Sequence, residues 1–186
     1  MPTAPHASST ASRTAPAKRP RATAHRAPDA IRLLKDDHKA VKALFKAYET
    51  LVKKDGSDAA KMKIAQQICT ALTVHATVEE ELLYPAAREA LPAADEDLVD
   101  EATVEHAGAK ELIAQIEASS PKEALFDARV KVLGEYIAHH VKEEETEMFP
   151  LLRKQDLDLK ALGVQIAQRK KDLLAGRGAV PPVMRQ

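Results

Sequence analysis

Apolar residues recur at steps of three and four along five stretches of the chain, which is the spacing of amphipathic helices. The stretches run from Asp29 to about Lys54, from Asp58 to about Leu91, from about Asp95 to Ala118, from about Pro121 to Gln155, and from Asp156 or Asp158 to about Ala175. Asp29 and Asp58 stand where helix N-caps are expected, and Pro121 suits a first helical turn. The pattern predicts an all-α protein.

Four of these apolar stripes are interrupted by histidine or glutamate at positions that should face the core. One histidine interrupts the first stripe and one the third, and a His-x-x-x-Glu pair interrupts the second and the fourth. Residues four apart lie on one helix face, so both members of each pair point the same way. The six interruptions are His38, His75, Glu79, His106, His140 and Glu144.

The two halves of the chain repeat each other. A proline, Pro85 or Pro150, follows ten residues after the histidine of each pair and is expected to kink its helix. Short loops make each half an antiparallel helix pair, and two stacked pairs give an up-down-up-down four-helix bundle. All six interruptions then face one interior.

Six imidazole and carboxylate groups in one core require a compensating charge, because an unpaired buried ion costs several kcal/mol. Divalent cations are the simplest compensation. Imidazole with carboxylate suits iron, manganese or zinc, and two carboxylates allow bridging between two ions. A single such histidine is more often a packed core residue, and a single pair is often a surface contact. Four interrupted stripes that share one phase and form a twofold repeat favour the metal interpretation.

Several nearby residues are assigned lesser roles. His139 lies one residue off the stripe and should be exposed or touch the ligands from outside. Solvated faces are expected for Glu80, Glu81, Glu143 and Glu145. Tyr48 and Tyr136 lie on apolar stripes, so core packing is favoured over lining a ligand pocket.

Composition narrows the remaining functions. Lys plus Arg and Asp plus Glu both number 28, so net charge gives no argument for a nucleic-acid or membrane partner. Residues 1–28 are basic, free of acids and poor in large apolar residues, which predicts a disordered tail. We expect the bundle over 29–155, a C-terminal helix over 156–175 and a frayed end over 176–186. A single cysteine and the absence of a long apolar run predict a soluble, cytoplasmic protein.

The motifs Asp37-His38, His75-Ala-Thr-Val-Glu79, Glu105-His106 and His140-Val-Lys-Glu-Glu144 resemble the hemerythrin-like, HHE cation-binding family. Leu-Tyr-Pro and Met-Phe-Pro follow the two longer motifs, and the similarity covers about Ala30 to Leu174. The resemblance implies a non-haem di-iron centre with an oxo-type bridge, held by the six residues named above. Oxygen-carrying members have a further histidine where this chain has Lys110, and Lys42 stands at the equivalent place after His38. This difference disfavours reversible oxygen carriage.

Two classes of function remain open. In the first, a di-iron centre binds or turns over a small oxidant, namely O2, H2O2 or NO. In the second, the protein is a non-catalytic iron or oxygen sensor or an iron store, and metal occupancy stabilises the bundle and controls a partner interaction. A helical interaction module without metal is a third reading, which metal analysis would exclude.

Overall fold

A computed structural model describes residues 29–178 of the chain; the basic tail and residues 179–186 lie outside the described residues. Helices dominate the described part, which contains no strand. Seven α-helices occur: α1 (Ala30–Lys53), α2 (Asp58–Val78), α3 (Tyr84–Ala90), α4 (Asp97–Glu117), α5 (Phe126–Glu143), α6 (Phe149–Leu152) and α7 (Leu159–Gly178). Three short segments join some of them: two π turns, Glu79–Leu83 and Glu144–Met148, and a 3-10 turn, Ala93–Asp95.

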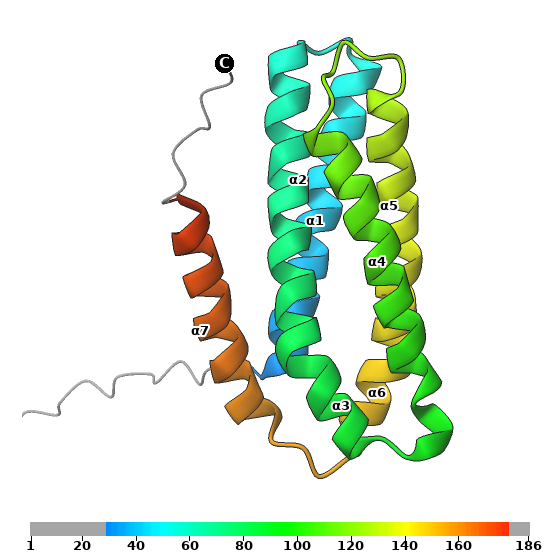
Figure 1. The fold of residues 1–186 in the computed structure, drawn as a ribbon, viewed down its shortest axis with the longest axis vertical. Helices are drawn as coiled ribbons and strands as arrows, with labels where there is room; N and C mark the ends of the chain where they lie inside the picture. Colours follow the sequence, from blue (N-terminus) through cyan, green and yellow to red (C-terminus); the bar gives the residue numbers. More distant parts are fainter. Residues whose placement is uncertain (1–28, 179–186) are drawn as a thin grey trace, which may run out of the picture.

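Four long rods form the expected up-down-up-down bundle (Figure 1). The first rod is α1, the second runs from α2 through a π turn into α3, the third is α4, and the fourth runs from α5 through a π turn into α6. Helix α1 packs on α2 and α5, and α4 packs on α5 and α2. The two sequence repeats are therefore two helix pairs in one bundle.

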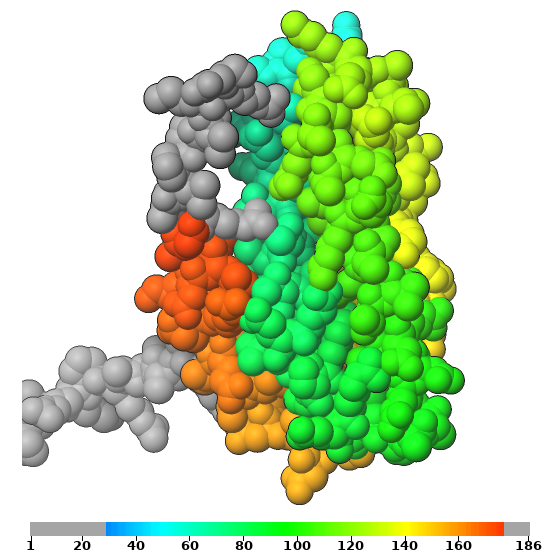
Figure 2. Space-filling view, in the orientation of Figure 1, coloured from blue at the N-terminus to red at the C-terminus, as the bar shows by residue number. Residues whose placement is uncertain are grey.

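Helix α7 lies outside the bundle, along α1 and α2 (Figures 1 and 2). The Asp158 carboxylate accepts hydrogen bonds from the backbone N–H groups of Lys160 and Ala161, which confirms Asp158 as the start signal. The predicted end at about Ala175 is three residues short, because α7 continues to Gly178. No helix within residues 29–178 has the length and apolarity required to cross a membrane.

The helix starts match the sequence only in part. The Asp29 side chain caps α1 by accepting from the Arg32 N–H. The capping side chain of α2 is that of Ser57, whereas Asp58 is the first helical residue. Pro121 does not open the fourth helix, since residues 121–125 form turns and α5 begins at the fully buried Phe126.

The expected break before each proline takes the form of a π turn. The Tyr84 N–H bonds to the carbonyl of Glu79, five residues back, and the Phe149 N–H bonds to that of Glu144. A π turn holds one residue more than an α turn, so it rotates the helix face that follows. The chain buries Leu83, where a regular helix would have placed Leu82.

The core consists of two apolar clusters with a polar layer between them. One cluster fills the end of the bundle where α3, α6 and α7 meet and includes Leu34, Phe149 and Ile166. The other fills the opposite end and includes Tyr48 and Phe126. The buried histidines and glutamates belong to neither cluster. This arrangement places a charged site at mid-height in an otherwise apolar interior.

Candidate metal centre

The six predicted residues converge in the polar layer, and all are buried. The Nε2 atoms of His38 and His75 lie 3.1 Å apart, and those of His106 and His140 lie 3.2 Å apart. Each pair joins a helix to its neighbour in the same sequence repeat. The interruptions of the apolar stripes are thus one cluster, as the helical phase predicted.

The two carboxylates connect the two halves of the cluster. Glu79 Oε2 lies 3.1 Å from Nε2 of His75 and 3.5 Å from Nε2 of His106. Glu144 Oε2 lies 3.2 Å from Nε2 of His38 and 3.7 Å from Nε2 of His140. Each glutamate therefore reaches one histidine of its own repeat and one of the other. That is the placement of a bridging ligand.

These donors form two overlapping groups that could each hold an ion. One consists of His38, His75, Glu79 and Glu144, and the other of Glu79, His106 and His140. Within each group the ligand atoms lie within 4.8 Å of one another. Glu79 belongs to both groups, so two ions at this spacing would share it.

Unpaired carboxylate oxygens show that the cluster is incomplete without a cation. Both oxygens of Glu79 and Oε2 of Glu144 are buried and lack a hydrogen-bond partner among the described residues. Such groups are rare because each carries an uncompensated desolvation cost. The residues present therefore fit a pair of divalent cations bound by nitrogen and oxygen donors.

Charge is distributed unevenly over the cluster. Burial and the neighbouring Glu144 raise the pKa of Glu79 to about 7. Burial acts against ionisation of Glu144 as well, but the adjacent His38 and the charges of the other histidines lower its pKa. Burial lowers the pKa of His106, whereas Glu144 reverses that effect at His38 and raises its pKa to about 9. In the metal-free cluster, protonation is thus favoured at Glu79 over Glu144 and at His38 over His106.

Each of the four histidines also contacts a carboxylate through its outer nitrogen. His38 Nδ1 lies 2.9 Å from Glu145, and His106 Nδ1 lies 3.0 Å from Glu80. His75 and His140 do the same with acids from the preceding helix, their Nδ1 atoms lying 3.4 Å from Asp37 and 2.7 Å from Glu105 respectively. A proton on Nδ1 leaves the Nε2 lone pair facing the cluster, which is the tautomer that a metal ligand requires.

We call Asp37, Glu80, Glu105 and Glu145 the outer carboxylates. They occupy equivalent positions in the two repeats: one acid precedes the histidine of the first helix, and one follows the glutamate of the second. The prediction that Glu80 and Glu145 belong to solvated faces is therefore wrong, since both are half-buried against histidines. Their equivalent positions in the two repeats are the feature of the sequence that could have indicated this role.

Three outer carboxylates are in turn paired with lysines, and the fourth, Glu105, lies near a histidine. Lys110 donates to Glu80 at 2.6 Å, and Lys170 of α7 donates to Asp37. Lys35 lies 3.1 Å from Glu145, and the exposed His139 lies 3.8 Å from Glu105. Lys110 stands at the position where the resemblance leads us to expect a histidine in oxygen carriers. It pairs with the outer carboxylate Glu80 and adds no donor to the cluster.

One residue breaks the twofold pattern. The Tyr84 hydroxyl lies 3.2 Å from Nε2 of His106 and 3.3 Å from Glu144 Oε1. The equivalent residue in the second repeat is Phe149, which has no hydroxyl and stacks on the His38 ring at 5.8 Å between centroids. The two halves of the cluster therefore differ in their polar surroundings. Tyr48, in contrast, packs in the core as expected and donates to Asp127.

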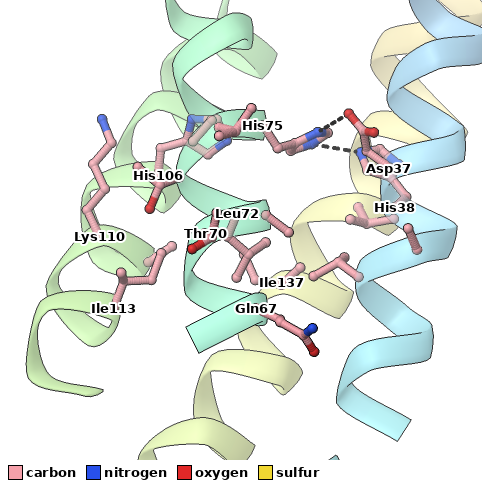
Figure 3. Close-up of a pocket in the computed structure, with 18 of the residues that line it drawn as sticks. Asp37, His38, Gln67, Thr70, Leu72, His75, His106, Lys110, Ile113 and Ile137 are labelled. Atoms are coloured by element: carbon pink, nitrogen blue, oxygen red, sulfur yellow. Dashed lines mark hydrogen bonds and ion pairs between the residues drawn. The ribbon is translucent and has the colours of Figure 1, made fainter. Parts of the chain in front are cut away.

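A cavity of about 490 Å³ borders the cluster (Figure 3). All four histidines line it, whereas Glu79 and Glu144 do not. Its other inner walls are apolar, with Leu72 and Ile137 projecting into the space between the helices (Figure 3). The cavity thus lies on the histidine side of the cluster and extends along α2 toward the α1–α2 loop.

Comparison with known proteins agrees with this architecture. The model of the hemerythrin HHE cation-binding domain family matches residues 29–152. A hemerythrin HHE cation-binding domain-containing protein from Mycobacterium kansasii has a similar solved structure, with a TM-score of 0.65 and 20% identity. The similarity covers 80% of this chain and 89% of that one, and at this identity it shows the shared fold.

A curated relative is much longer than this chain. The DNA nickase of Nostoc sp. (strain PCC 7120 / SAG 25.82 / UTEX 2576) is 34% identical over 126 residues. That match takes up 67% of this chain but 33% of the nickase. The matched region thus spans about a third of the curated relative.

Proposed function

Because the chain belongs to the hemerythrin HHE cation-binding family, we propose that its polar layer holds two iron ions and that this di-iron centre binds or turns over a small oxidant. O2, H2O2 and NO are the candidate oxidants. The convergence of four imidazoles on two carboxylates whose buried oxygens lack partners carries the proposal. Iron supplies the redox chemistry, and the donor set suits it.

The proposed ligands are His38, His75, Glu79, His106, His140 and Glu144, with Glu79 and Glu144 shared between the ions. The outer carboxylates hold the imidazole rings in place and keep the proton on Nδ1. The apolar clusters above and below cover the layer along the bundle axis. Six protein donors leave coordination positions open on two six-coordinate ions, which is where a small oxidant would bind.

A sensor or store is the second candidate, and one chain of contacts favours it. Lys170 of α7 bonds to Asp37, and Asp37 bonds to His75. A change in metal occupancy at His75 would therefore alter the contact between Asp37 and α7, which lies outside the bundle. We do not infer DNA nicking, the activity in the name of the Nostoc protein, for this chain, because the match covers a third of that protein.

The test uses purified protein loaded anaerobically with Fe(II) and then exposed to air. We expect two irons per chain, an oxo-to-iron charge-transfer absorption, and consumption of H2O2. His75→Ala and His140→Ala should each lose iron, because each removes a proposed ligand. Lys142→Ala is the control, because Lys142 is exposed and lies two residues after His140 on the same helix.

The outcomes separate the candidates. Full iron content in both ligand variants would refute the ligand assignment. Loaded protein that is inert toward H2O2, O2 and NO but more stable than the metal-free form would favour the sensor or store. If the protein bound no metal after loading, the hypothesis of a helical interaction module without metal would remain.

A further inference from the structure

The cavity beside the histidines is far larger than a small oxidant needs. Its volume of about 490 Å³ compares with about 30 Å³ for one water molecule in the liquid. Folded cores leave few voids larger than a water molecule, so a space of this size within a bundle requires an explanation. It falls in the range of roughly 300–1,000 Å³ that is typical of sites for organic ligands.

The walls of the cavity change character along its length. At the inner end the histidines are followed by a ring of aliphatic side chains, Val41, Leu72, Ile113 and Ile137. At the outer end the lining residues are exposed and polar and include Lys63, Gln66 and Gln67 of α2. An apolar interior with a polar, cationic mouth matches a linear amphiphile with an anionic head.

Lys63 is the cation at this mouth that is available to a ligand. The other lining lysines, Lys110 and Lys170, are engaged by outer carboxylates. Lys63 has no ion pair with any residue in the range 29–178. The amide side chains of Gln66 and Gln67 lie beside it on α2 and offer further hydrogen-bond donors.

The length of the cavity sets the length of the ligand. Lys63 and His75 both line it and are twelve residues apart on one helix, which corresponds to about 18 Å along the axis. A ligand with its head at Lys63 and its tail against the histidines is therefore an extended chain of medium length.

We propose that this cavity binds a medium-chain aliphatic carboxylate, with the carboxylate at Lys63 and the chain end against the histidine layer. This site goes beyond the proposed function and does not depend on it, because Lys63 and the aliphatic side chains that would hold the ligand are not among the proposed metal ligands. If both hold, the centre is reached through an apolar chamber that an organic molecule fills.

Isothermal titration calorimetry of the full-length protein with dodecanoate tests the proposal, using metal-free and iron-loaded samples. We expect one dodecanoate per chain in both. Ala71→Phe places a ring in the cavity and should weaken binding by at least about tenfold. Ala43→Phe is the matched control, because Ala43 is an exposed residue of α1 that does not line the cavity.

A second variant tests the head group without altering the chamber. Lys63→Gln should weaken dodecanoate binding by about fivefold, the scale of an exposed ion pair, and leave the affinity for 1-dodecanol unchanged. No dodecanoate binding, or equal affinities for wild type and Ala71→Phe, would overturn the proposal. Dodecanoate binding by a protein that takes up no iron would instead refute the di-iron proposal and leave this site standing.

Discussion

Glu79 is the residue on which the charge balance of the polar layer depends most. It is fully buried, and neither of its carboxylate oxygens has a hydrogen-bond partner among the described residues. Glu144, by comparison, is held by Tyr84 and His38. An ionised Glu79 therefore destabilises the metal-free fold and becomes favourable only next to a cation.

Replacing Glu79 with glutamine should change how the stability of the metal-free protein depends on pH. Because the folded pKa of Glu79 is raised from 4.5 to about 7, its protonated form stabilises the fold fully below pH 4.5. That contribution is lost as pH rises to about 7, a loss on the order of 1–3 kcal/mol. Glu79→Gln cannot ionise, so it lacks this loss.

Urea denaturation with a chelator present, repeated from pH 4.5 to 8, measures the effect. Glu79 is the only ionisable group that differs between the two proteins, so the difference between the two curves reports its ionisation together with that of the groups coupled to it. We expect the variant to be the more stable protein at pH 8 and to bind less metal. Curves that stay parallel over this range would show that Glu79 does not carry the proton.

The six central residues could be predicted from the sequence because helical phase alone decides which way a side chain faces. His75 and Glu79 share a face at a spacing of four, and the second repeat confirmed the pattern. The partners of Glu80 and Glu145 could not be found this way, because each contacts a histidine of the other repeat. Periodicity within one helix carries no information about a neighbouring helix.

At the level of the helices, the π turns are the feature that sequence periodicity missed. Leu82 and Leu151 continue an α-helical stripe, but the chain buries Leu83 and Leu152. The extra residue in each π turn lets a glutamate and the following apolar residues face the same interior. The prolines indicated that the helix would be interrupted. The π turn that forms there, with its extra residue, depends on packing against the other helices.

The outer carboxylates act between elements, and Glu145 is the clearest case. It follows the proposed ligand Glu144 in a π turn and reaches His38 on α1. Glu145→Gln should lower iron affinity by about 10–100-fold, the usual effect of losing such a partner. The amide removes the charge that favours a proton on His38 Nδ1. Competition with a calibrated chelator measures the change.

Glu147→Gln is the control for this experiment, because Glu147 lies in the same π turn but is exposed. It removes the same charge at nearly the same distance along the chain. Equal losses of affinity in the two variants would indicate a general charge effect and contradict a specific role for the contact between Glu145 and His38.

At the scale of the whole molecule, α7 extends the structure beyond the matched domain, which ends at residue 152. Its Leu162 and Ile166 side chains join the apolar cluster of the bundle. Arg169 makes two hydrogen bonds to Glu81, and Lys170 bonds to Asp37. The sequence predicted this helix but not its position, because an amphipathic stripe does not specify which groove it covers.

If α7 is part of one cooperative unit, a core deletion in it should destabilise the entire bundle. Ile166→Ala removes a side chain with 0% exposure and should cost about 2–4 kcal/mol. Val164→Ala, two residues away on the exposed side, should cost less than about 0.5 kcal/mol. Thermal unfolding followed by circular dichroism should show a single transition at lower temperature for Ile166→Ala. An unchanged main transition preceded by a small separate one would mean that α7 melts alone, and its contact with Asp37 would then contribute little to holding the centre.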